Sequence, residues 1–333
     1  MNKNRILYKS VYFFFSLSCL FCNTLRDSQL AEWLVGAQQS IAAATFASGV
    51  LCRITRDAEA WATLADVEAS SHLALGDTAR ALEGFLRLVE AHESRALREP
   101  GRADYQRDLS VSYDRLGDLM SALGQGEEAR RLFEQSLQIR QRLAEAEPGR
   151  ADYQRNLSVS YNKLGDLMSA SGQGEEARQL FEQSMQICQQ LAKAEPERTD
   201  RQRDLAASHN KIGEHCAAMG EVAQAVGSIE TALCIFQVIA EPNDGDQRTL
   251  FALYDRLGDL HRAQGSNEQA REFFAHALAV SQSLEATAPD HIEHQRELCV
   301  AYIKLGDELR NLAQADQARP LFEQSVRIAT GGC

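Results

Sequence analysis

Clusters of basic residues are missing from this chain, which is acidic overall. Of its 333 residues, 35 are Lys or Arg and 47 are Asp or Glu, so the formal net charge is -12. Because phosphate binding depends on clustered cations, this balance argues against a nucleic-acid partner. A charged fraction of 25% beside an apolar fraction of 44% is ordinary for a folded protein and argues against disorder.

Signatures of sheets and of catalysis are also lacking. No segment alternates apolar and polar residues with period two, so no sheet is expected. No Ser/His/Asp or Cys/His arrangement can be recognised. The segment GQGEEA, which occurs twice, is not followed by the Lys-Ser/Thr pair of a phosphate-binding loop. We therefore expect no enzymatic activity, no cofactor and no small-molecule substrate.

The cysteines of this sequence are not spaced as metal ligands are. Eight cysteines occur, and the six that follow residue 24 are scattered without a shared spacing. The nearest approach to a metal site is the group His291, His294 and Glu297. His294, however, stands at a position that tyrosine occupies in the repeats described below, so packing is the simpler interpretation and no metal is expected. A metal protein that uses His291 and His294 stays an alternative.

The N-terminal segment differs from the rest. In residues 1–24, basic residues precede an apolar run that is too short to span a bilayer but fits a secretory signal or a membrane anchor. Residues 25–58 are expected to form a helical cap on the array that follows. Scattered free cysteines favour a cytoplasmic location. The leader leaves export or anchoring open, with membrane contact only through residues 1–24.

The main feature of the chain is an internal repeat. Residues 149–196 copy residues 101–148 with 9 differences in 48 positions, far closer than shared helical composition would produce. Three more diverged copies follow, one of them after 45 residues, and a degenerate copy precedes the clear ones. Residues 59–333 are thus predicted to hold one degenerate and five clear units.

Each unit is predicted to form two helices. Apolar residues recur at intervals of three and four from Leu109 to Met120, and again from Ala129 to Leu137 after a break at two glycines. Gly117 lies on the first stripe, where the missing side chain lets the partner helix approach closely. The packing energy gained by this approach must outweigh the cost of glycine inside a helix, which is about 1 kcal/mol relative to alanine. Prolines between most units cannot continue a helix and separate the hairpins.

The pattern aromatic-x2-Leu-Gly-x2-apolar-x3-Gly-x4-Ala-x3-Phe-x2-small-apolar covers roughly residues 60–330 and resembles the tetratricopeptide repeat. That family typically repeats every 34 residues. The longer period here is similar to that of kinesin-light-chain-type proteins and of bacterial signalling proteins. The resemblance implies an all-α fold: an α-solenoid, a right-handed superhelix of stacked antiparallel helical hairpins.

Polar residues also recur on the first helix of each unit. Directly after the aromatic position comes Asp or Asn, except for Ile303 in the fifth clear unit, then Arg or Lys, and three residues further an acid. In the family that the chain resembles, first helices line a concave groove whose Asn, Lys and Arg residues hold an extended peptide. The candidate partner-binding residues are therefore Asn162, Lys163, Asn210, Lys211, Arg115, Arg256 and Lys304. The simpler alternative is that each cation pairs with the acid three residues on, as on any solvated helix face.

These observations predict a non-enzymatic scaffold that binds a partner peptide or protein segment, of acidic character, in the groove. The alternative is a regulatory or sensor region of a larger multidomain signalling protein. Partner identity, pathway and oligomeric state are not encoded in the pattern.

Overall fold

The computed structural model describes residues 58–239, 243–289 and 291–330, and all regular structure in these ranges is helical. The expected leader and all of the expected N-terminal cap except Ala58 lie outside the described residues. The helices are α4 (Ala58–Ala74), α5 (Thr78–Arg98), α6 (Ala103–Ala122), α7 (Gly126–Ala146), α8 (Ala151–Ala170), α9 (Gly174–Ala194), α10 (Thr199–Ala218), α11 (Val222–Gln237), α12 (Asp244–Ala263), α13 (Asn267–Thr287), α14 (Ile292–Asn311) and α15 (Ala315–Ala329).

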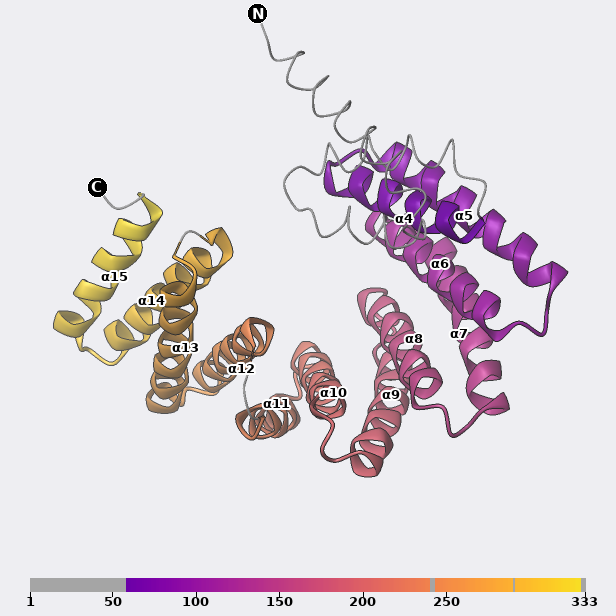
Figure 1. Ribbon diagram of the computed structural model, residues 1–333. Helices are drawn as coiled ribbons and strands as arrows, with labels where there is room; N and C mark the ends of the chain where they lie inside the picture. The colour runs from indigo at the N-terminus through magenta and orange to yellow at the C-terminus, as the bar shows by residue number, and fades with distance from the viewer. Residues whose placement is uncertain (1–57, 240–242, 290, 331–333) are drawn as a thin grey trace, which may run out of the picture. The chain divides into compact units, whose positions relative to one another are not determined.

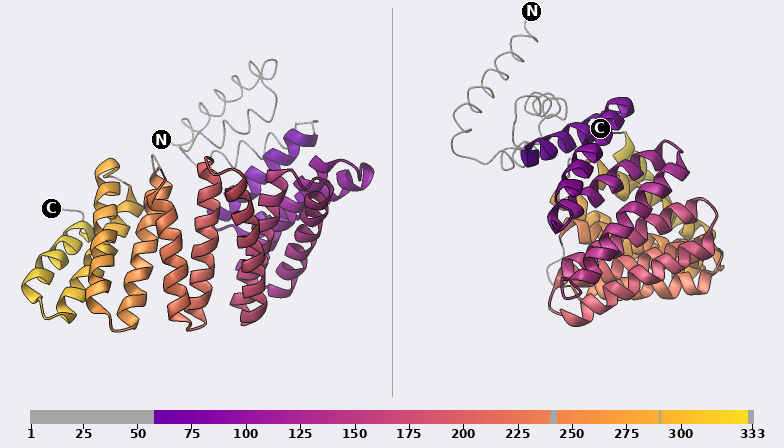
Figure 2. Two further views of the ribbon diagram at one scale, coloured as in Figure 1. Left: turned by 90° about the horizontal axis from the view of Figure 1, so that it is seen from below. Right: turned by 90° about the vertical axis from the view of Figure 1, so that its right-hand side faces the viewer.

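Consecutive helices pair as hairpins, which confirms the predicted all-α repeat fold (Figure 1). The chain divides into two compact units, one ending at Ala146 and the other beginning at Glu147. The first unit contains α4 to α7 and the second contains α8 to α15. Within the second unit the helices stand side by side, as the left view of Figure 2 shows. Each hairpin packs on the next because α9 contacts α10, α11 contacts α12 and α13 contacts α14.

The turn inside each hairpin requires a left-handed backbone conformation. Gly124 has φ +74° between α6 and α7, and glycine takes the same conformation between the helices of four other hairpins. Only glycine adopts this region without a steric penalty. In the α14–α15 hairpin the position is held by Ala313, with φ 59°, so that hairpin carries a strain the others avoid.

Gly117 has the close contact that the sequence predicts. A Cβ atom built on Gly117 would lie 2.7 Å from the ring of Phe133, which comes from the second helix of the same hairpin. Real Cβ atoms essentially never approach a carbon so closely, so any side chain here would push the ring away. The aromatic residue of the second helix therefore fills the space that the missing side chain leaves, and this sets the spacing of the two helices.

Two apolar clusters hold the second unit together. In one, Phe274 and Leu278 of α13 pack against Leu298, Ala301 and Leu305 of α14. In the other, the corresponding residues of α11 pack against Leu253 and Leu257 of α12. Both clusters thus extend across the boundary where the second helix of one repeat meets the first helix of the next.

The two nearly identical repeats differ in one buried polar pair. In α6–α7, Arg140 Nη2 lies 2.6 Å from Asp114 Oδ2, and both side chains are almost inaccessible, with exposed fractions of 6% and 7%. Arg140 Nε also donates a hydrogen bond to Ser110 at 3.2 Å. In α8–α9 the corresponding pair is Cys188 and Asn162, which is neutral. A charged pair and a neutral pair therefore occupy the same place in sibling repeats.

Glu308 is a buried carboxylate at a position where three sibling repeats carry leucine. It is fully buried in α14, and neither oxygen finds a hydrogen-bond partner of good geometry. Burial raises the pKa of its carboxyl, opposed by nearby Arg262 and Asn311 and reinforced by Asp307. The α14 helix thus carries a group that destabilises its packing when charged.

Candidate functional site

The polar positions of the first helices come together in the second compact unit. Contacts from the candidate cations Lys211, Arg256 and Lys304 join helices α8, α10, α12 and α14. In each contact a cation of one repeat reaches an acid or amide of the preceding repeat. We call this row, formed by Lys211, Arg256, Lys304 and the groups they contact, the central ladder.

Lys211 forms the most accessible contact of the central ladder. Its Nζ lies 3.0 Å from Asp166 of α8 and 3.5 Å from Glu214 on its own helix. The exposed fractions of the Lys211 and Asp166 side chains are 31% and 52%. Burial opposes the charge of Lys211, but Asp166 and Glu214 outweigh it and raise the pKa of its ammonium.

Arg256 connects α12 to two groups of α10. Its Nη2 lies 2.5 Å from Glu214 Oε1, and its Nη1 donates a hydrogen bond of 2.7 Å to Asn210 Oδ1. The amide nitrogen of Asn210 in turn donates to Glu214 at 3.2 Å. Asn210 therefore uses both its carbonyl oxygen and its amide nitrogen in hydrogen bonds to protein groups.

Lys304 is held by two acids at once. Its Nζ lies 2.7 Å from Asp255 and 2.7 Å from Asp259, both on α12. Burial raises the pKa of Asp255, and the hydrogen bond from Lys304 opposes that rise. Two short contacts thus fix the Lys304 ammonium to α12.

The remaining candidates occupy related places. In the first compact unit, Arg115 Nη2 lies 3.0 Å from Asp66 of α4, and its Nη1 lies 3.3 Å from Ser70. Asn162 and Lys163 are half-buried on α8, and the Asn162 Oδ1 atom is enclosed without a hydrogen-bond partner.

The simpler expectation, that each cation pairs with the acid three residues on, is correct for only part of this surface. Lys211 has such a contact, but Arg115, Arg256 and Lys304 are held by the preceding repeat instead. The physical reason is that stacking brings the first helices close enough for a long side chain to reach the neighbouring helix. The cations thus connect neighbouring repeats in addition to lying on an exposed helix surface.

A second row of ion pairs was not predicted from the sequence. It consists of Arg155–Asp204 at 2.6 Å, Arg203–Asp246 at 2.7 Å and Arg248–Glu297 at 2.8 Å. Here the cation belongs to the earlier repeat, so the direction is opposite to that of the central ladder. The available signal was the arginine that recurs near the start of the first helix in all five clear units, as Arg107, Arg155, Arg203, Arg248 and Arg296.

The suspected metal group is explained by packing and pairing. His294 is buried, its ring stacks on that of His291 with centroids 4.2 Å apart, and Glu297 accepts a hydrogen bond from Arg248. Within the described ranges, no three His, Cys, Asp or Glu residues are grouped as a metal site. In the same ranges, no helix has the length and apolarity needed to cross a bilayer.

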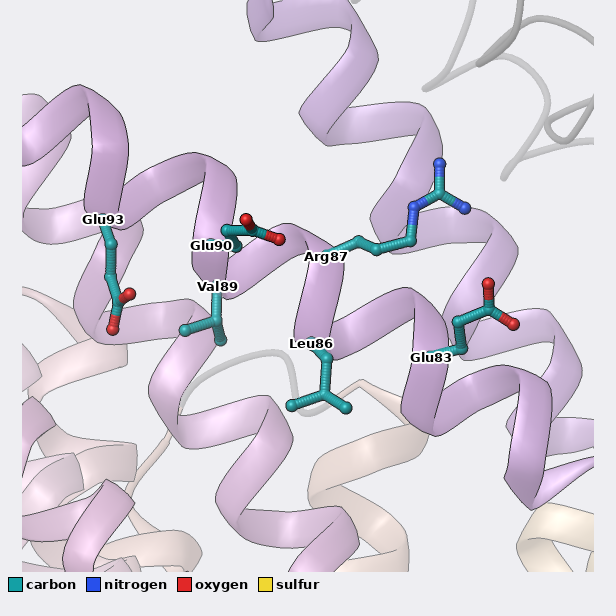
Figure 3. A pocket seen from close by; sticks show the side chains of 6 residues that line it. All are labelled: Glu83, Leu86, Arg87, Val89, Glu90 and Glu93. Atoms are coloured by element: carbon teal, nitrogen blue, oxygen red, sulfur yellow. The ribbon is translucent and has the colours of Figure 1, made fainter.

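A shallow hollow on α5 offers no site of its own. It is lined by Glu83, Leu86, Arg87, Val89, Glu90 and Glu93 (Figure 3). All six side chains come from one helix and do not converge on a common point. Glu93 accepts a hydrogen bond of 2.7 Å from Tyr113, so this acid connects α5 to the first helix of the next hairpin.

Comparisons with known proteins agree with this geometry. A model of the tetratricopeptide repeat matches residues 108–190, and a second one matches residues 251–293. Residues 108–190 and 251–293 are therefore tetratricopeptide repeats. No sequence among curated proteins matches the chain.

Solved structures with similar folds include other repeat proteins. The structure of BtubC (BKLC) from P. vanneervenii aligns with a TM-score of 0.60 and 21% identity, over 76% of this chain and 91% of that one. A kinesin-light-chain-type protein of Podosopora anserina with nearly identical TPR-like repeats aligns with a TM-score of 0.49 and 23% identity, over 66% of this chain and 94% of that one. The likeness to BtubC supports the fold. Tetratricopeptide repeats generally mediate protein–protein interaction, and proteins built from them generally bind protein partners.

Proposed function

We propose that this tetratricopeptide-repeat protein is a non-enzymatic scaffold that binds an extended, acidic segment of a partner protein along the first helices of the second compact unit. The observation that carries the proposal is the accessible Lys211–Asp166 contact on the central ladder. An ion pair exposed in this way contributes only about 0–1 kcal/mol. A partner carboxylate can therefore replace Asp166 at Lys211 with little loss of internal stability.

The other members of the central ladder have different roles in this proposal. Lys304 and Arg256 each contact two protein groups at 2.5–2.7 Å, so they hold the helices in register more than they bind the partner. Asn162 and Lys163 lie on α8, next to the helix that carries Lys211. Binding is thus centred on α8 and α10 of the second compact unit, and it extends toward Arg256 only for long segments.

A peptide selection tests this proposal. A library of random peptides is selected against the full chain and against a variant with Asn162, Lys163, Asn210 and Lys211 changed to Ala. We expect peptides rich in Asp and Glu from the wild type and their loss from the variant. Lys193→Ala serves as the control, because Lys193 is exposed on the second helix α9. The same acidic peptides from wild type and quadruple variant would refute the proposed site.

A further inference from the structure

The surface of α15 repeats a helix-binding surface that is occupied elsewhere in the chain. On α13, Phe274 and Leu278 have exposed fractions of 1% and 8%, because α14 covers them with Leu298, Ala301 and Leu305. The same arrangement recurs where α12 covers α11. In both places, the second helix of a repeat receives the first helix of the repeat that follows.

On α15 the corresponding apolar residues are not covered to that extent. Phe322 takes the place of Phe274 and is only half-buried, and Val326 takes the place of Leu278 with an exposed fraction of 61%. No first helix follows α15 among the described residues. Within the described residues, the α15 counterpart of a helix-covered apolar surface is therefore uncovered.

The polar part of the same surface lacks one of its contacts. On α12, Asp259 is approached by Arg262 of its own helix at 2.5 Å and by Lys304 of the next first helix at 2.7 Å. The equivalent acid on α14 is Asp307, whose ion pair is with Arg310 of its own helix at 2.8 Å. Ile303, 43% exposed, replaces the second acid. The open surface thus combines apolar residues with one acid placed to receive a cation.

We propose that this surface, formed by Ile303, Asp307, Phe322 and Val326, binds an amphipathic helix of a partner protein. The helix has the chemistry of this chain's own first helices. Its apolar stripe has the spacing of Leu298, Ala301 and Leu305, and a Lys or Arg directly precedes the last leucine, as Lys304 does. The stripe covers Phe322 and Val326, and the cation reaches Asp307. This surface is separate from the central ladder residues of α8 and α10, so either proposal can fail without the other.

The experiment uses a fluorescent peptide with the sequence of residues 151–170 as the probe. This sequence has Leu157, Ser160 and Leu164 at the required spacing and Lys163 before the last of them. Because an isolated helix of 20 residues is marginally stable in water, a side-chain staple on the opposite face keeps it helical. Fluorescence anisotropy measures its binding to the full chain, and we expect saturable binding.

Two variants and one control assign the binding to this surface. Val326→Asp is expected to weaken binding at least tenfold, whereas the control Val238→Asp, at a valine that is 80% exposed against 61% for Val326, leaves it unchanged. Circular dichroism checks that both variants remain folded. The protein variant Asp307→Lys is expected to bind the wild-type peptide severalfold more weakly. It is expected to restore the binding of a peptide that carries Lys163→Glu. Absence of saturable binding, or equal binding by Val326→Asp, overturns the proposal.

Analytical ultracentrifugation of the full chain tests whether a second copy of the chain occupies this surface instead. Self-association that Val326→Asp abolishes would assign the surface to a second copy of the chain and overturn the partner-helix proposal. A monomer that binds the peptide supports it.

Discussion

The buried Asp114–Arg140 pair allows a quantitative test, because the chain itself contains the neutral alternative. Removing one partner of a buried ion pair typically costs about 3–5 kcal/mol, since the other charge stays in a poorly solvated place. Both side chains are at most 7% exposed and their charged atoms lie 2.6 Å apart, so this range applies here. We expect Asp114→Asn and Arg140→Cys each to lower the free energy of unfolding by about 3 kcal/mol.

The double variant reproduces the Asn162–Cys188 pair of the next repeat. Since no unbalanced charge remains, we expect its cost to be smaller than the sum of the single costs by about 2–3 kcal/mol, the coupling typical of contacting residues. Urea unfolding followed by circular dichroism gives the free energies. Hydrogen exchange of α6 and α7 amides locates the effect, because repeat arrays do not always unfold in one step.

The control is the exposed pair Arg131–Glu128 of the same hairpin, which has the same 2.6 Å distance but exposed fractions of 64% and 43%. Its removal should cost no more than about 0.5 kcal/mol. The reasoning is refuted if the double variant is as unstable as the two single variants added together, or if the exposed pair costs as much as the buried one.

Three further predictions concern stability. Replacing Glu308 by Leu, as in three sibling repeats, should stabilise the protein by about 1–3 kcal/mol at pH 7. Because burial raises the pKa of Glu308 above 4.5 in the folded state, the folded state binds the proton more tightly. The penalty is therefore absent below about pH 4.5, and it grows as pH rises through the folded pKa; a gain independent of pH in denaturant titrations would contradict this. Ala313→Gly should stabilise the α14–α15 hairpin by about 1 kcal/mol, since φ 59° is strained for alanine, and slower hydrogen exchange in α15 would show it. Gly117→Ala should destabilise α6–α7 by about 1–3 kcal/mol by displacing Phe133, and thermal unfolding at or above the wild-type midpoint would argue against the close contact.

Much of the fold could be predicted from the sequence because each part of the repeat depends on residues that are close together in the chain. Helix stripes depend on spacings of three and four, turns on single glycines, and helix contact on small residues such as Gly117. Each of these signals spans fewer than about 20 residues, one helix length. Five copies of the same signal made the prediction robust, and the Gly117–Phe133 contact agrees with it.

The candidate site was less predictable, because it depends on contacts between residues far apart in the chain. The central ladder joins residues of neighbouring repeats that lie 42 to 49 positions apart, such as Arg256 with Glu214 and Lys304 with Asp255. A sequence pattern shows that cations and acids recur, but not which acid a cation reaches. The sequence alone therefore identified the recurring polar positions, and the stacking of hairpins decided which of them contact each other.

The sequence by itself determined that this protein is a row of helical hairpins, because helix, turn and close contact follow from residues near one another. Only the tertiary structure decided that Asp114 meets Arg140, that Glu308 is buried, and that Val326 is left open. These outcomes depend on which surface of one helix is covered by another. That coverage is set by the packing of whole hairpins, which no local pattern contains.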